Sequence, residues 1–267
     1  MARRKHKSGE DGLVTQLREE IRRRLFPHRH TALLAALIVM FLVRPFTGDS
    51  GAGPPLTTVA MLLLLMLALY NIDVDELVGD RKLLLAQRRR RNIIAWTLGV
   101  PAVLERLVAL LAPTHKLYFG GTFLWLLLFA YITWNELRAV LKQKEVTREV
   151  ISMSISTYLL LGFTCGLFYI TLHDVQPNAF SFGAGAPVSE TQTIPVLIYF
   201  SLTTLSTIGF GDITPVTLQA RYVAVAEGIA GQFYLAILVA RLVGMQMTQS
   251  STQQAEQEAI ESDTKAE

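Results

Sequence analysis

Long apolar runs separated by short polar segments dominate the chain. A helix needs roughly 20 apolar residues to cross the hydrocarbon core of a membrane, and most of these runs approach that length. The pattern predicts spans at about 31–46, 56–72, 93–111, 117–134, 151–172 and 216–247. A further apolar run, 193–205, is too short to cross, so we expect a re-entrant helix there. The chain is therefore predicted to be an all-α membrane protein with six transmembrane helices and one re-entrant helix.

Charged residues fall on alternating sides of this predicted arrangement. Residues 1–30, the loop that ends at 88–91 and residues 136–150 are rich in Lys and Arg. The loop 173–191 contains Asp174 and Glu190 but no Lys or Arg. Because basic loops stay in the cytosol, the charges predict a multi-pass protein of the cell membrane with both termini cytosolic.

The same pattern divides the chain into five segments. They are a basic cytosolic N-terminus (1–30), a four-helix transmembrane bundle (31–136), an interfacial linker helix (137–150), a unit with two spans and the re-entrant helix (151–247), and an acidic cytosolic tail (248–267). Within the first segment, Leu13, Leu17, Ile21 and Leu25 recur every fourth residue. This spacing fits a membrane-surface helix, but a solvated tail remains an open alternative.

One polar stretch interrupts the apolar runs near the C-terminus. Residues 203–212 read Thr-Thr-Leu-Ser-Thr-Ile-Gly-Phe-Gly-Asp and cannot cross lipid alone, because their backbone polar groups would be left without partners. Gly209 and Gly211 adopt positive φ easily, so the backbone between them can alternate until successive carbonyls point the same way. Rings of such carbonyls replace the hydration shell of a potassium ion.

The hexapeptide at 207–212 resembles the signature filter of potassium channels, whose commonest form is Thr-Val-Gly-Tyr-Gly-Asp. The resemblance continues through 215–218 and Arg221, and it covers about 151–247. It implies a homotetramer with one filter segment per chain and a pore domain at 151–247. It also implies that potassium binds at Thr207, Ile208, Gly209 and Phe210, with Gly211 completing the filter.

The resemblance also implies residues that support the filter. Tyr199 and Phe200 fall where many members carry paired aromatics, although ordinary apolar packing explains them as well. At Thr203 some members have a glutamate that is hydrogen-bonded to the aspartate at the position of Asp212. Thr203 lacks that carboxylate, so filter stability and inactivation cannot be carried over from the family.

Glu227 is an ionisable residue within the last predicted span, where a charged group needs a partner. We expect it to pack against the re-entrant helix near Thr203 or Ser206, as a substitute for the missing carboxylate.

Gly231 aligns with the hinge glycine of the inner helix in small bacterial potassium channels. The structural alternative is that this glycine permits close helix contact. If the alignment holds, the side chains facing the pore are those of Gln232, Leu235, Val239 and Val243. Leu235 and Val239 then form a hydrophobic constriction that gates by dewetting.

Composition supports a membrane location. Of 267 residues, 51% are hydrophobic and only 18% are charged, against about 25% in soluble domains. The net charge of +3 comes from clusters beside apolar runs, which favours anionic lipids over nucleic acid as partners. The expected lipid-binding residues are Arg22, Arg23, Arg24, Arg88, Arg89, Arg90 and Arg91. No catalytic constellation is evident, so we expect no enzyme and no cofactor besides permeating potassium.

The fourth predicted span, 117–134, contains no Arg or Lys between its ends. Steep voltage gating requires such charges to move through the membrane field, so we expect none. Glu105 and Arg106 in the third span are interpreted as an ion pair. A cluster of carboxylates after the second span either binds a divalent cation or pairs with nearby arginines; its members are Asp73, Asp75 and Glu76.

These observations predict a potassium-selective channel that passes potassium passively. A weakly selective cation channel of the same architecture and a non-conducting membrane scaffold remain as alternatives. The gating stimulus and the role of the first four spans stay open.

Overall fold

The computed structural model describes residues 29–43, 59, 62–64, 66–68, 93–94, 97–104, 108, 118–143, 145–183 and 190–266. These residues are mostly helical. The named helices are α2 (Arg29–Val43), α5 (Tyr118–Lys142), α6 (Arg148–Val175), α7 (Glu190–Leu205) and α8 (Leu218–Ala266). In this part of the chain, three stretches are long and apolar enough to cross a membrane: Gly121–Lys142, Arg148–Val175 and Leu218–Ser251. Such composition is that of a membrane protein.

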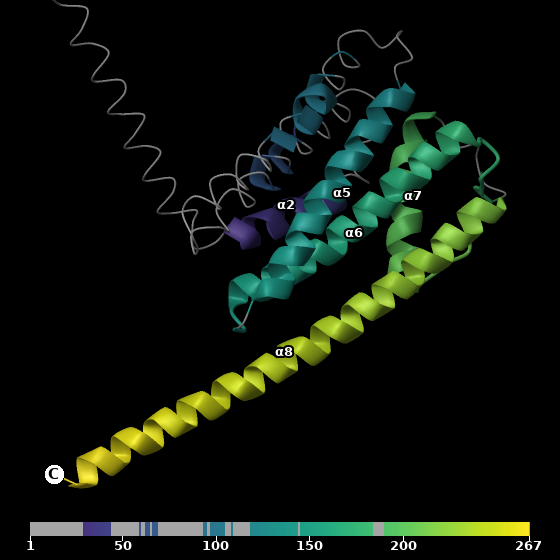
Figure 1. Ribbon diagram of the computed structural model, residues 1–267. Helices are drawn as coiled ribbons and strands as arrows, with labels where there is room; N and C mark the ends of the chain where they lie inside the picture. The colour runs from purple at the N-terminus through teal and green to yellow at the C-terminus, as the bar shows by residue number, and fades with distance from the viewer. Residues whose placement is uncertain are drawn as a thin grey trace, which may run out of the picture.

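Helix α6 occupies the centre, with α2, α5, α7 and α8 all packed against it (Figure 1). Along the α5–α6 interface, Leu128, Ile132 and Leu160 are almost completely buried. The hydroxyl groups of Thr133 and Thr164 lie 2.8 Å apart within this contact. The core of the described chain is therefore mainly apolar, and this pair of hydroxyl groups links the two helices within it.

The predicted interfacial helix at 137–150 is wrong. Residues 137–142 continue α5, and α6 begins at Arg148 after a break of five residues. Val140 is 4% exposed, so the apolar residues of this stretch extend the buried side of α5 instead of lying on a membrane surface. Thr147 then opens α6, because its hydroxyl accepts a hydrogen bond from the Val150 amide at 3.3 Å.

Two glycines on α6 let α7 approach closely. A Cβ atom on Gly162 would lie 2.5 Å from the Leu202 side chain. A Cβ atom on Gly166 would lie 3.0 Å from the Ile198 backbone. Since these glycines are four residues apart, they share one face of α6, which therefore seats α7.

Two short strands connect the segment after α6 to the segment after the filter. β1 (Phe180–Ser181) and β2 (Thr214–Pro215) pair antiparallel, with Phe180 opposite Pro215. The Val216 amide also donates to the Ala179 carbonyl at 2.8 Å. This pairing fixes the chain that leaves the filter against the end of α6.

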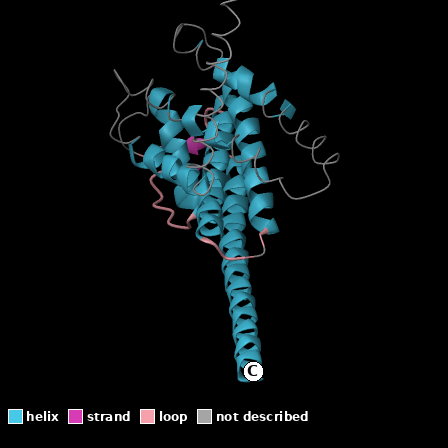
Figure 2. Cartoon of the chain, turned by 90° about the vertical axis from the view of Figure 1, so that its left-hand side faces the viewer, coloured by secondary structure: helices cyan, strands magenta, loops and turns pink. Residues whose placement is uncertain are grey.

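Helix α8 is by far the longest element. Its 49 residues correspond to about 74 Å, more than twice the hydrophobic thickness of a membrane. It continues through the predicted acidic tail to Ala266, and its C-terminal part projects past the other described helices (Figures 1 and 2). The hydroxyl of Thr217 accepts from the Ala220 amide at 3.4 Å at its start.

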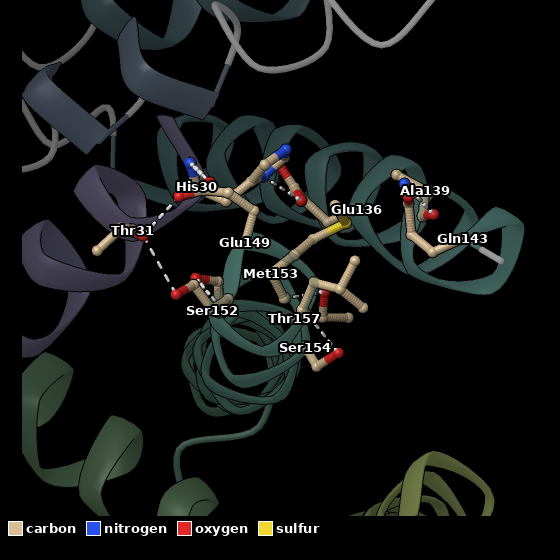
Figure 3. A network of polar contacts seen from close by, with 12 residues as sticks. His30, Thr31, Glu136, Ala139, Gln143, Glu149, Ser152, Met153, Ser154 and Thr157 are labelled. Carbon is tan, nitrogen blue, oxygen red and sulfur yellow. Dashed lines mark hydrogen bonds and ion pairs between the residues drawn. The ribbon is translucent and has the colours of Figure 1, made fainter. Parts of the chain in front are cut away.

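A polar network joins the N-terminal end of α2 to α5 and α6 (Figure 3). The His30 amide and the Thr31 hydroxyl donate to the two carboxylate oxygens of Glu149, at 3.1 and 2.8 Å. The His30 Nδ1 lies 3.6 Å from Glu136 Oε2, and both side chains are 2% exposed. Three helices thus meet through polar groups at one end of the bundle, with His30 and Glu136 buried and Thr31 exposed.

Several predicted features lie outside the described residues and stay predictions. They are the arginines at 22–24 and 88–91, the carboxylates Asp73, Asp75 and Glu76, and the pair Glu105 and Arg106.

Candidate functional site

The backbone of the predicted filter alternates in handedness. Thr207, Gly209 and Gly211 have φ values of 60°, 53° and 78°, whereas Ile208 and Phe210 between them do not have positive φ. The positive φ expected for the two glycines is therefore present. Thr207 adds a third position that the sequence did not predict, because a non-glycine residue in this region carries steric strain of about 1–2 kcal/mol. Strain of this kind concentrates at functional sites.

Hydrogen bonds to the end of α7 orient this backbone. The amides of Ile208 and Gly209 both donate to the Thr203 carbonyl, at 2.9 and 3.2 Å. The Thr207 amide donates to the Thr204 carbonyl at 3.0 Å. In a trans peptide the carbonyl points opposite to the amide hydrogen, so the carbonyls of Thr207 and Ile208 point away from α7. Consecutive carbonyls therefore share one direction, as a cation-binding wall requires.

Glycine is needed at the two filter positions because of the backbone conformation. Within one chain, there is enough room for a larger side chain. A Cβ atom on Gly209 or Gly211 would meet nothing within 4 Å. Any other residue at these φ values is strained, whatever room surrounds it. Ile208 and Phe210 are 58% and 68% exposed, so one chain leaves the filter uncovered.

The two predicted aromatic supports have different roles. The Tyr199 ring is stacked nearly parallel to the Phe210 ring, with centroids 6.3 Å apart. The Tyr199 hydroxyl also hydrogen-bonds to the Asp212 carboxylate. The ring of Phe200 instead contacts Tyr169 of α6 and Phe180 of β1, at centroid distances of 5.2 and 5.5 Å. Of these two rings, that of Tyr199 is stacked on a filter side chain, whereas the contacts of Phe200 are those of the packing alternative.

Glu227 lies between α8, α7 and α6 and is 3% exposed. The Ser201 hydroxyl of α7 and the Tyr169 hydroxyl of α6 each lie 2.5 Å from one of its carboxyl oxygens. The carboxyl group therefore packs against the re-entrant helix, but its hydrogen-bond partners differ from the expected neighbours Thr203 and Ser206. Those two residues bond instead to backbone carbonyls, Thr203 to that of Phe200 and Ser206 to that of Leu202.

The Ser201 hydroxyl has two acceptors but one proton. It lies 2.6 Å from the Gly162 carbonyl and 2.5 Å from Glu227 Oε1. Both contacts are satisfied when Glu227 carries a proton on Oε1 and donates to Ser201, which then donates to Gly162. Tyr169 donates to the other carboxyl oxygen. The Cys165 thiol of α6 also hydrogen-bonds to this carboxyl group, which therefore joins α8 to both α7 and α6.

Gly231 lies where α8 touches the end of α7. A Cβ atom there would lie 2.6 Å from the Leu205 carbonyl oxygen and 2.8 Å from its side chain. The helix continues through this position without interruption. Of the two interpretations of Gly231, the structure shows the close contact, and the hinge remains a prediction.

The remaining predicted pore residues lie on one side of α8. Gln232, Leu235, Val239 and Val243 are all exposed in the single chain. Their spacing of three or four residues places them on a common helix face. Other exposed apolar side chains of α8 extend to neighbouring faces: Tyr222, Ile229, Phe233 and Ile237.

Sequence reasoning missed the partners that hold α8 in place. Besides Ser201 and Tyr169, these include Tyr234, whose hydroxyl donates to the Ser154 carbonyl at 2.6 Å and whose ring stacks on Tyr158. A polar residue in an apolar helix was the available signal for Ser201. For the tyrosines no local signal exists, because their contacts join residues far apart in the chain.

Residues 155–247, from α6 to within α8, match a family model described as an ion channel. The match includes the filter, the re-entrant helix α7 and the contacts of Glu227 described above. Proteins of this class pass ions and are not enzymes. Residues 155–247 therefore match an ion channel domain, which supports the resemblance to potassium channels.

Proposed function

We propose that four copies of the chain surround a common axis and pass potassium ions selectively down their electrochemical gradient. The ions bind in single file to carbonyl oxygens of Thr207, Ile208, Gly209 and Phe210, which replace their hydration shell. The observation that carries this proposal is the alternating backbone at 207–211, whose carbonyls of Thr207 and Ile208 point away from α7.

Exposed groups of the single chain support the assembly. The filter and most of α8 are uncovered, although both belong to an ion channel domain. In a tetramer, one face of α8 lines the pore with Gln232, Leu235, Val239 and Val243. Neighbouring faces with Tyr222 and Phe233 then pack on adjacent copies or contact lipid. The end of α7 also carries a partial negative charge that favours a cation in the central cavity.

The proposed topology has six spans across the cell membrane, with both termini in the cytosol. The filter segment then lies toward the extracellular side. It retains the cytosolic N-terminus, the four-helix bundle at 31–136, the pore domain at 151–247 and the cytosolic end of the chain after 247. The arginines at 22–24 and 88–91 contact anionic lipids in this arrangement. It places the loop after α6 outside and the α5–α6 connection inside.

Flux into lipid vesicles tests this function. Purified protein is reconstituted at known stoichiometry, and uptake of potassium and of sodium is compared under equal gradients. Uptake of potassium alone supports the proposal. Equal uptake of both ions indicates the weakly selective cation channel, and no uptake by intact tetramers indicates the scaffold.

A further inference from the structure

Arg241 on α8 closes the C-terminal end of α5. Its Nη1 donates to the Val140 carbonyl at 3.0 Å, and its Nη2 donates to the Gln143 carbonyl at 2.6 Å. Helix α5 ends at Lys142, so both acceptors belong to its last turn and the residue that follows. The side chain that bonds them comes from an element about 100 residues further along the chain.

The chemistry of this contact is specific. The last carbonyls of a helix lack the usual partners four residues ahead and carry partial negative charge. The Val140 carbonyl accepts from the Gln143 amide at 3.2 Å as well as from Arg241. The planar guanidinium group presents several donors in a fixed fork and can bind two oxygens at once. A further carbonyl of the same turn, that of Ala139, accepts from the Gln143 side chain at 3.3 Å (Figure 3). Arg241 and the Gln143 side chain thus together cap the C-terminal end of α5.

Arg241 lies on α8 next to the residues that are predicted to line the pore. It lies 23 residues after Leu218, or about 35 Å along the helix axis, and is closer to the C-terminus than Glu227 and Tyr234 are. Val239 and Val243, the expected pore residues, are two positions away on either side. Two residues correspond to about 200° around a helix, so these valines face away from α5. A shift of α8 at Arg241 therefore moves the predicted constriction with it.

The end of α5 is in turn connected to the rest of the bundle. Glu136, one turn and a half before Lys142, faces His30 of α2 at 3.6 Å. The connection between α5 and α6 has only five residues, so α5 packs on α6 of its own chain. Within one chain, contacts therefore run from α2 through α5 to Arg241.

We propose that Arg241 is a positioning residue for channel opening, which latches the inner helix to the end of α5. This inference rests on the proposed function, because it assigns a role in gating. The latch stabilises one conformation of α8 relative to the others and couples the N-terminal bundle to the pore. Its loss changes how often the channel is open but leaves the path of the ion through the filter unchanged.

The test is single-channel recording of reconstituted full-length chains in symmetric potassium at fixed pH and voltage. In Arg241→Gln, we expect the ratio of open to closed time to change at least about tenfold, because hydrogen bonds from a charged donor are lost. Unitary conductance and the reversal potential in a potassium–sodium gradient stay at wild-type values. Lys142→Gln is the matched control: it removes a charge from the same helix end but neither hydrogen bond, and wild-type gating is expected.

Arg241→Lys keeps the charge and provides the second variant if Arg241→Gln fails to assemble. Its ammonium group cannot reproduce the fork, so we expect a change of severalfold in the same ratio. Wild-type gating of an assembled Arg241 variant would overturn the latch, as would altered conductance with unaltered gating. A wild-type protein that passes no potassium would instead refute the proposed function, so the two failures are distinguishable.

Discussion

The carboxyl group of Glu227 on α8 lies 2.5 Å from the hydroxyl of Ser201 on α7. This contact joins the inner helix to the helix whose end holds the filter backbone. Tyr169 adds a third helix to the same carboxyl group. This buried polar cluster therefore helps to position α7, and with it the filter. Its members are Glu227, Ser201, Tyr169 and Cys165.

Glutamine is predicted to replace Glu227 with little loss. Its amide donates to Ser201 while its carbonyl accepts from Tyr169, as the protonated carboxyl group does. Glu227→Ala leaves both hydroxyls without that partner and is expected to cost about 1–3 kcal/mol per chain. Thermal unfolding of purified protein and potassium flux together check this. A glutamine variant as unstable as the alanine variant would show that the negative charge itself is needed.

Alanine at Gly209 or Gly211 is predicted to abolish potassium conduction while the tetramer still assembles. Both positions have positive φ, and alanine there forces the backbone and its carbonyls to turn. Potassium flux and the size of the complex are measured on the same preparation.

Gly244→Ala is the matched control for these filter variants. Gly244 also has free space around it but lies within α8, at an ordinary helical φ. Conduction is expected to persist. Selective potassium flux through assembled Gly209→Ala protein would contradict the filter assignment.

Gly231→Ala and Gly228→Ala are predicted to change the free energy of unfolding in opposite directions. The added methyl group at Gly231 would lie 2.6 Å from the Leu205 carbonyl oxygen, so overpacking is expected to destabilise the fold by about 1–3 kcal/mol. At Gly228 the nearest atom is 3.7 Å away, an ordinary contact, and alanine gains up to about 1 kcal/mol of helix propensity. Unfolding temperatures of the two variants give the answer. Equal stability would mean that α7 and α8 are less closely packed than described.

Opening is predicted to lack steep voltage dependence. One charge that crosses the whole field yields about 2.3 kcal/mol per 100 mV, so a steep response needs several mobile charges per subunit. Helix α5 has no Lys or Arg from Tyr118 to Trp134. A conductance–voltage curve in symmetric potassium, without internal blocking ions, measures this. A steep sigmoid that survives neutralisation of Arg106 would reveal a sensor elsewhere.

Local chemistry explains which parts of this structure the sequence predicts. Apolar length alone predicts α6 and the membrane part of α8, because a span needs about 20 apolar residues whatever surrounds it. Gly209 and Gly211 predict the filter backbone in a similarly local way, because glycine adopts positive φ without steric strain whatever surrounds it. The family match at 155–247 then confirms the resemblance that these residues carry.

Features that depend on packing were not predictable. Leu137 and Val140 among basic residues fit a surface helix as well as the continuation of α5, and only the burial of Val140 decides between them. The partner of Glu227 depends on which face of α7 turns toward α8. Ser201 and Ser206 lie on that short helix or at its end, and the sequence does not rank them.

The reversal potential of the purified full-length protein in a planar bilayer, with potassium on one side and sodium on the other, tests the central claim most directly. A filter of backbone carbonyls at 207–210 predicts a reversal potential close to the potassium equilibrium potential, which shifts as the potassium gradient is changed. A reversal potential that stays near zero in this gradient, with currents carried equally by both ions, would contradict potassium selectivity.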